Sequence, residues 1–262
     1  MSEIGAIFNR SGHKALITYL TVGYPSVAAT LEIVPLLASS GCDLVELGIP
    51  FSDPLADGAT IQRASYQALK QGVTPELCLE VAGKLRAKVD TPLVFMTYFN
   101  PVFSYGLNAF CKNSAQAGIS GLIIPDLPPE EGTELESISL KHGLDLIYML
   151  APTSTDKRID IVAARSRGFI YLVSMTGVTG SRDKLPKELE SFVLRVRRKT
   201  RQPLCVGFGI SNAEQARRVA NIADGIIVGS RLIQLIDEKD NTTKVRSFVL
   251  SLRNAISNQA EN

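Results

Sequence analysis

The feature that most constrains the fold of this chain is a repeated alternation of short apolar runs with longer helical patterns. Eight runs rich in Val, Ile and Leu recur at a mean spacing of about thirty residues, and a segment with helical periodicity follows each run. The runs are Ala15–Thr21, Leu44–Gly48, Leu93–Thr97, Gly121–Ile124, Leu146–Leu150, Phe169–Val173, Leu204–Gly207 and Gly225–Val228. Near-continuous apolar strands are typical of a parallel sheet that is covered by helices.

Eight βα units within 262 residues predict an α/β fold of the (β/α)8 TIM-barrel type, built as one domain over residues 1–262. We expect additional helices at the N-terminus and in the loops, and a frayed polar tail at 257–262. A doubly wound open sheet is the alternative, although open sheets seldom use eight equally spaced units. Two helix starts have their own signals: Thr74 followed by proline, and a capping box made by Ser211 and Glu214.

Charge and cysteine usage limit the partners and the compartment. The formal net charge of +2 gives no strong field for a polyanion, so no nucleic-acid partner is expected. The N-terminal residues lack a signal-peptide pattern, and no apolar run approaches the roughly 18–20 residues that span a bilayer. The four cysteines are widely spaced: Cys42, Cys78, Cys111 and Cys205. This spacing predicts reduced thiols and no zinc site, as in a cytoplasmic protein. With no apolar run long enough to span a bilayer, no membrane contact is expected.

The carboxyl ends of the predicted strands carry acids rather than lysine or histidine. The absence of lysine from the strands argues against a Schiff base, and the absence of histidine argues against a metal centre. Glu46 lies within an apolar strand, where burial would raise its pKa and suit it to proton transfer. A structural salt bridge to a buried arginine is the alternative, but no strand supplies one. Asp57, on the long loop after that strand, is the second candidate, and Asp126 is either a third acid or a loop tether.

Glycines after the last two strands predict an anion site. Gly207 and Gly209 follow the seventh strand, and Gly229 with Ser230 follows the eighth. Such loops bring backbone N–H groups close to a phosphate, and in TIM barrels this is the recurring place for one. The loop 176–181 is a third possible donor. The pattern alone therefore indicates a small phosphorylated substrate and carboxylate chemistry, with isomerisation, epimerisation and carbon–carbon cleavage all open.

The same segments resemble the tryptophan synthase alpha chain family. The resemblance rests on Glu46 with the motif Leu47–Gly58, and on the later segments Leu150–Thr153, Gly177–Gly180 and Phe208–Ser211. It runs in order along nearly the whole chain. One departure is Ala59, which stands where the family usually has proline after Asp-Gly.

The resemblance implies cleavage of indole-3-glycerol phosphate to indole and glyceraldehyde 3-phosphate, a carbon–carbon lyase reaction of tryptophan biosynthesis. Glu46 and Asp57 would be the catalytic pair. Glu46 would protonate indole C3 and then accept the proton of the substrate hydroxyl, while Asp57 would hold the indole N–H and stabilise positive charge there.

Further site residues follow from the same resemblance. The indole pocket would be lined by Tyr19, Met96, Tyr98, Ile123 and Tyr171, although Met96 and Ile123 suit a barrel core almost equally well. The phosphate would be held by Gly180, Phe208, Gly209, Gly229 and Ser230. Thr179 would close the loop over it.

The resemblance also implies a partner. A beta chain carrying pyridoxal phosphate would receive indole in an α2β2 complex, and the alpha chain itself would hold no cofactor and no metal. Two other functions stay open at this stage: a stand-alone lyase that releases free indole, and a non-catalytic regulatory subunit that binds phosphate ligands.

Overall fold

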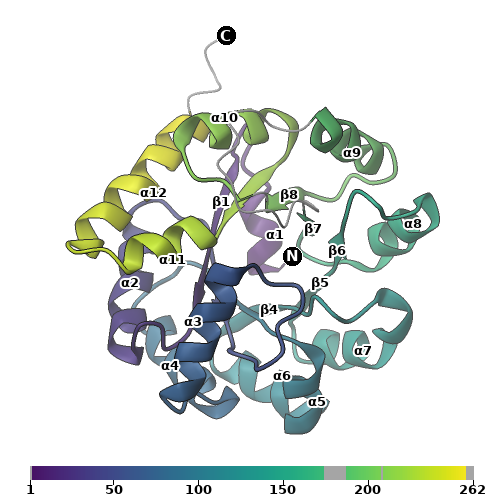
Figure 1. The fold of residues 1–262 in the computed structure, drawn as a ribbon. Helices are drawn as coiled ribbons and strands as arrows, with labels where there is room; N and C mark the ends of the chain where they lie inside the picture. Colours follow the sequence, from purple (N-terminus) through teal and green to yellow (C-terminus); the bar gives the residue numbers. More distant parts are fainter. Residues whose placement is uncertain (1, 174–186, 208, 258–262) are drawn as a thin grey trace.

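The strands of the chain form one parallel sheet that closes into a barrel (Figure 1). The computed structural model describes residues 2–173, 187–207 and 209–257. The strand order is β5-β4-β3-β2-β1-β9-β8-β7-β6. The strands are β1 (Ala15–Thr21), β2 (Leu44–Gly48), β3 (Leu93–Met96), β4 (Ile119–Ile123), β5 (Asp145–Ile147), β6 (Met149–Leu150), β7 (Ile170–Val173), β8 (Leu204–Gly207) and β9 (Gly225–Val228).

The predicted fifth strand is divided into β5 and β6 by Tyr148. The backbone N–H of Tyr148 donates to the Ser166 hydroxyl at 3.0 Å instead of joining a strand ladder. β5 pairs with β4 and β6 pairs with β7, so the two pieces fill one position in the ring. Within the described residues the barrel therefore has eight strand positions, and the predicted TIM-barrel fold is confirmed.

Helices surround the barrel, and several of them lie outside the basic βα repeat (Figure 1). The helices are α1 (Glu3–Ile7), α2 (Val27–Ser39), α3 (Ala59–Lys70), α4 (Pro75–Arg86), α5 (Phe99–Tyr105), α6 (Leu107–Gln116), the 3-10 helix η1 (Pro129–Glu131), α7 (Thr133–Lys141), α8 (Asp156–Arg165), α9 (Lys187–Arg197), α10 (Ala213–Ile222), α11 (Ser230–Ile236) and α12 (Asn241–Ser257). The extra helices at the N-terminus and in the loops are as predicted. Ser257, where the frayed tail was expected to begin, is the last residue of α12, and 258–262 lie outside the described residues.

One of the two predicted helix starts is correct. The Thr74 hydroxyl accepts a hydrogen bond from the Leu77 N–H at 3.3 Å and caps α4. The capping box of Ser211 and Glu214 is wrong, because Asn212 caps α10 and accepts from the Gln215 N–H at 2.9 Å. Asn is as good an N-cap as Ser, and it lies one residue closer to the helix.

Apolar side chains form an inner layer within the barrel and an outer layer between the strands and the helices. Leu44 belongs to the inner layer, whereas Val45 and Leu47 pack in the outer layer. The short helix α1 adds Ile4 and Ile7 to the inner layer. Full burial of a residue such as Ile4 contributes about 1.5–3 kcal/mol. Together these contacts close the amino end of the barrel and leave the carboxyl end available for a site.

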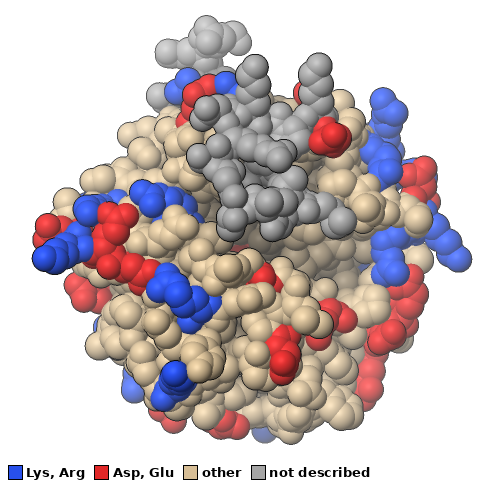
Figure 2. Space-filling model, viewed as in Figure 1, with Lys and Arg blue, Asp and Glu red and all other residues tan. Residues whose placement is uncertain are grey.

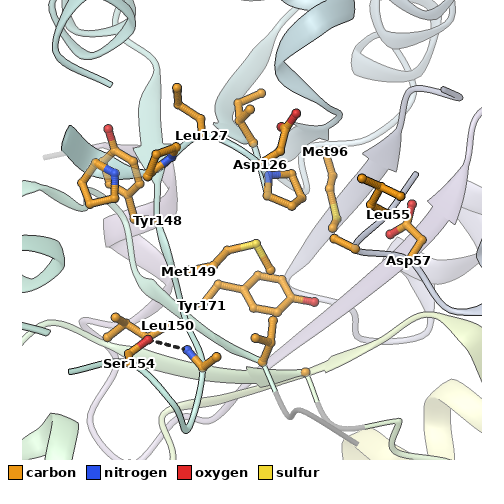
Figure 3. Close-up of a pocket in the computed structure, with 18 of the residues that line it drawn as sticks. Leu55, Asp57, Met96, Asp126, Leu127, Tyr148, Met149, Leu150, Ser154 and Tyr171 are labelled. Atoms are coloured by element: carbon orange, nitrogen blue, oxygen red, sulfur yellow. Dashed lines mark hydrogen bonds between the residues drawn. The ribbon is translucent and has the colours of Figure 1, made fainter. Parts of the chain in front are cut away.

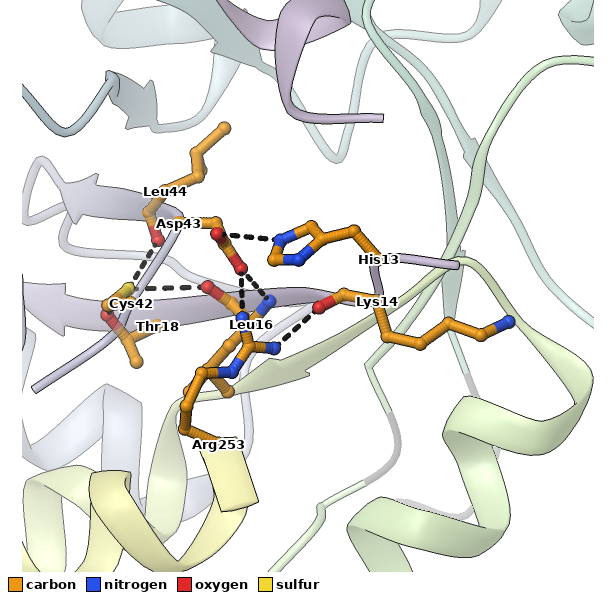
Figure 4. A network of polar contacts seen from close by, with 8 residues as sticks. All are labelled: His13, Lys14, Leu16, Thr18, Cys42, Asp43, Leu44 and Arg253. Carbon is orange, nitrogen blue, oxygen red and sulfur yellow. Dashed lines mark hydrogen bonds and ion pairs between the residues drawn. The ribbon is translucent and has the colours of Figure 1, made fainter. Parts of the chain in front are cut away.

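Near the start of β2, a polar network ties the chain termini together (Figure 4). One carboxylate oxygen of Asp43 lies 2.8 Å from His13 Nε2, and the other accepts from the Leu16 N–H at 2.8 Å. The same second oxygen accepts from Arg253 Nη1 at 3.0 Å, which fastens α12 to the barrel. The Asp43 carboxylate is therefore fully paired.

Candidate active site

Glu46 is buried inside the barrel, and no described residue forms a hydrogen bond with its carboxyl group. Its neighbours along β2 alternate between the two layers, and Leu44, on the same side as Glu46, packs in the inner layer. The side chain is 0% exposed, and both carboxyl oxygens lack a partner among the described residues. Burial raises the pKa of Glu46 to about 8. No arginine pairs with it in the described structure, which contradicts the salt-bridge alternative, and the raised pKa favours the protonated carboxyl at neutral pH.

Asp57 is a partly buried carboxylate on the loop between β2 and α3. Burial raises its pKa to about 6, and a hydrogen bond from the Tyr98 side chain opposes that rise. The Tyr98 hydroxyl also accepts from the Ala56 N–H at 2.9 Å, and its ring stacks on Phe51 with centroids 5.2 Å apart. Both contacts lie on the N-terminal side of Asp57, so Tyr98 fixes the part of the loop that leads into it. At neutral pH most Asp57 is ionised.

A cavity of about 870 Å³ opens at the carboxyl end of the barrel, and Asp57, Met96 and Tyr171 line it (Figure 3). The loops after β4 and β6 form much of the remaining wall. Most residues of this wall are apolar: Leu55, Ile61, Ile124, Leu127, Pro128, Tyr148, Met149, Leu150 and Val173. Figure 3 shows Tyr171 and Met149 near the centre of this cavity, with Asp57 to one side. The volume falls within the usual range for a small-molecule site.

Other residues predicted for the indole pocket lie deeper. Tyr19 is 6% exposed and Ile123 is 0% exposed. Ile123 packs in the inner layer of the core, as its alternative interpretation states, while Met96 reaches the cavity. Charge on Glu46 and Asp57 raises the pKa values of both Tyr19 and Tyr171, although burial is the larger cause. The two tyrosines and the two carboxyls therefore share one electrostatic environment.

Two strand-end glycines make room for these tyrosines. A Cβ atom on Gly48 would lie 2.2 Å from the Tyr19 hydroxyl, and one on Gly207 would lie 2.7 Å from the Tyr171 hydroxyl. Gly207 therefore has a packing role that the sequence analysis did not foresee, and the importance of Gly48 was missed altogether. The sequence signal for this role is a glycine at the end of one strand when the adjacent strand carries a tyrosine that points into the barrel.

The described part of the predicted phosphate site consists of Gly209, Gly229 and Ser230. Gly209 has φ of +64°, a conformation that favours glycine, and nothing lies within 4 Å of a Cβ added there. Ser230 begins α11 directly after β9, and Gly229 precedes it next to Tyr19. Gly180, Phe208 and Thr179 lie outside the described residues, as does the loop 176–181.

Asp126 acts as a tether. Its carboxylate accepts a hydrogen bond from the Phe99 N–H at 2.8 Å at the start of α5, although the residue also borders the cavity. Gln62 is a second tether, which no sequence pattern indicated, and its side-chain amide donates to the Asp57 carbonyl at 2.9 Å. In the described residues, no three His, Cys, Asp or Glu side chains form a group that could hold a metal. No described helix has both the length and the apolar character to cross a membrane.

Comparison with known proteins decides between the reactions left open by this geometry. The family model for the tryptophan synthase alpha chain matches residues 6–260. The chain is 57% identical to the tryptophan synthase alpha chain of Dehalococcoides mccartyi, covering 98% of this chain and 100% of that one. It is 49% identical to that of a Roseiflexus species, covering 97% and 98%. The chain belongs to the tryptophan synthase alpha chain family.

Solved structures agree with this assignment. The tryptophan synthase alpha chain of Legionella pneumophila superposes with a TM-score of 0.91 at 34% identity, with 100% of both chains covered. A chain of tryptophan synthase from Mycobacterium tuberculosis superposes with a TM-score of 0.90 at 36% identity, covering 98% and 99%.

Family membership gives the reaction. As a tryptophan synthase alpha chain, this protein is a lyase that cleaves indole-3-glycerol phosphate in tryptophan biosynthesis. Its partner is a beta chain, and pyridoxal phosphate belongs to that partner rather than to this chain.

Proposed function

We propose that Glu46 and Asp57 carry the cleavage of indole-3-glycerol phosphate as a general acid–base and an electrostatic stabiliser. The observation that carries this proposal is the placement of the two acids: Glu46 is fully buried without a partner among the described residues, and Asp57 lines the cavity. This burial raises the pKa of Glu46 to about 8 and that of Asp57 to about 6. Two acids whose environments separate their pKa values take different roles at one pH. Between these values Glu46 holds a proton and Asp57 carries a negative charge.

In the first step, the protonated Glu46 carboxyl donates its proton to indole C3. Positive charge then develops at the indole nitrogen, where the Asp57 carboxylate accepts a hydrogen bond from the N–H and stabilises the charge. The Glu46 carboxylate next removes the proton of the substrate hydroxyl on the carbon bonded to C3. That O–H electron pair forms the aldehyde, the carbon–carbon bond breaks, and its electrons return to the ring to give indole. Glu46 regains its proton, so the cycle balances.

The substrate is bound by its two ends. The apolar wall of the cavity, including Met96 and Tyr171, suits the flat indole ring, and Tyr19 and Ile123 support the wall from beneath. Tyr98 orients Asp57. We assign the phosphate to the backbone amides of Gly180, Phe208, Gly209 and Gly229 and to Ser230, with Thr179 closing the loop. The positive φ of Gly209 and the position of Ser230 after β9 support this assignment.

The pH dependence of indole release tests the acid–base roles. We expect kcat/KM to fall below about pH 6, where Asp57 becomes protonated, and above about pH 8, where Glu46 loses its proton. Asp57→Asn should lower the rate by about 10²–10³-fold and remove the acidic limb. A rate that stays flat across this range in the unaltered chain would overturn the roles.

We also propose that the chain acts as one domain in the cytoplasm, within an α2β2 complex that passes indole to the beta chain. The four cysteines are buried and free, which supports a reducing compartment. Indole release by the isolated chain should rise by about 10–100-fold when a matched beta chain is added to saturation. Equal rates would favour a stand-alone lyase instead, and no turnover in either condition would favour a regulatory subunit.

A further inference from the structure

A polar cluster outside the cavity joins the helix that follows Asp57 to the helix that begins with Ser230. The cluster consists of Tyr24, Arg63 and Asp237. Arg63 lies on α3, and Asp237 ends α11 as its C-cap residue. Figure 1 shows α3 and α11 side by side, in agreement with their direct contacts.

Each member of the cluster contacts the other two. Arg63 Nη1 donates to the Tyr24 hydroxyl at 2.9 Å, and Nη2 forms an ion pair with Asp237. The Tyr24 hydroxyl donates to the other carboxylate oxygen of Asp237. The Arg63 guanidinium also lies 5.7 Å from the centroid of the Tyr24 ring. The Arg63 fork is therefore engaged by two partners on two different segments.

Stability of the helices does not account for this arrangement. An aspartate at the C-terminal end of a helix opposes the helix dipole, so Asp237 is unfavourable for α11 on its own. Arg63 and Asp237 are also partly exposed, with 46% and 31% of their side chains accessible, and such pairs contribute little to folding. The contacts do fix the position of one helix relative to the other.

The position of α3 in turn determines where Asp57 lies. Gly58 caps α3 without a side-chain hydrogen bond, so the helix start is not anchored by its own cap. Beyond the covalent connection through Gly58, the Gln62 side chain links α3 to the loop by donating to the Asp57 carbonyl. Beneath the cluster, Ala64 of α3 packs with Ile233 of α11 and with Tyr24 in a small apolar group. The lateral position of α3, and with it Asp57, is therefore set against α11.

We propose that Arg63 is a positioning residue, which together with Tyr24 and Asp237 holds Asp57 at a fixed separation from Gly229 and Ser230. This inference rests on the proposed function, in which Asp57 meets the indole nitrogen and Ser230 meets the phosphate of the same molecule. A rigid link between the two ends of a site favours the reactive pose, and small displacements of a catalytic group lower the rate strongly. The cluster acts through Asp57 and contacts no reacting atom.

The test is a set of variants assayed with a saturating matched beta chain. Arg63→Gln should lower kcat/KM for indole-3-glycerol phosphate by about 5–30-fold, since it removes the link without removing Asp57. In an Asp57→Asn background, Arg63→Gln should cause no further loss, because residues that act through one group are not additive. Arg63→Lys keeps the positive charge but loses the two-pronged guanidinium group. Its kcat/KM should therefore lie between those of the unaltered chain and Arg63→Gln. Arg218→Gln is the matched control, because it removes another exposed ion pair, with Glu214 on α10.

Inorganic phosphate provides a readout that a merely structural role would not give. It occupies only the phosphate end, so its inhibition constant should be the same in Arg63→Gln as in the unaltered chain. The proposal is overturned if Arg63→Gln retains normal kcat/KM, if its loss multiplies with that of Asp57→Asn, or if phosphate inhibition weakens in parallel. A normal rate for Asp57→Asn alone would instead overturn the role of Asp57 in the proposed function, so the two failures are distinguishable.

Discussion

Asp43 and Glu46 are two acids on the same short stretch of chain, and they have opposite surroundings. Asp43, at the entrance to β2, is paired with His13, the Leu16 N–H and Arg253. Glu46, farther along the strand, is 0% exposed and has no partner among the described residues. A buried acid without a partner costs stability, whereas a paired acid at the amino end stabilises the barrel. The comparison separates a residue that the fold needs from one that the fold tolerates.

The same contrast extends to the two ends of the barrel. At the amino end, α1 fills the interior and the network around Asp43 fastens α12. At the carboxyl end, the cavity is open and its face carries acidic and basic side chains interspersed with a broad uncharged surface (Figure 2). In barrels of this kind the amino end serves stability and the carboxyl end serves catalysis. Substitutions at the two acids should therefore affect different measurements.

The largest effect is expected for Glu46→Gln. The amide keeps the size of the side chain but cannot donate a proton to C3, so kcat should fall by about 10²–10⁴-fold. Circular dichroism and the thermal midpoint should show a folded protein. Near-normal indole release by a folded Glu46→Gln chain would show that Glu46 is only a core residue.

Asp43→Asn should give the opposite pattern. The amide removes the negative charge that pairs with the Arg253 guanidinium, so the free energy of unfolding should fall by about 2–3 kcal/mol. The rate per folded molecule should stay close to normal, because Asp43 lies at the other end of the barrel. Urea titration measures the first quantity, and active-site-normalised turnover measures the second. A large loss of turnover without a loss of stability would break the division between the two ends.

The sequence predicted the ring of strands well because the eight apolar runs are long and regular. It also predicted that Glu46 is buried, since this acid lies within an apolar strand that is covered on both faces, and the catalytic role of Glu46 stays a prediction. It failed where short-range choices compete: Asn212 rather than Ser211 caps α10, and Tyr148 divides a strand because Ser166 takes its N–H. The contacts of Gln62 and Arg63 depend on how α3 lies against α11. No local pattern encodes that placement.

The most gradual expected effect is a dependence of stability on pH, to which Glu46 contributes most and Asp57 contributes at the acidic end. The pKa of Glu46 is about 8 in the folded chain, against an ordinary value of 4.5. Between these values the folded state keeps a proton that the unfolded state has lost, so the free energy of unfolding falls as pH rises. The slope is about 1.4 kcal/mol per pH unit, and it ends once pH exceeds the folded pKa.

Glu46→Gln removes this titration. The free energy of unfolding of the variant should therefore exceed that of the unaltered chain, and the difference should grow from pH 5 to pH 8. Asp43→Asn is the matched comparison, because it leaves Glu46 in place and should keep the slope of the unaltered chain. Urea titrations of the three proteins at pH 5, 6, 7 and 8 measure these differences. A margin for Glu46→Gln that stays constant over this range would mean that Glu46 is already ionised in the folded state. In that case Glu46 could not be the resting proton donor, and the contrast between the paired and the unpaired acid would lose its chemical meaning.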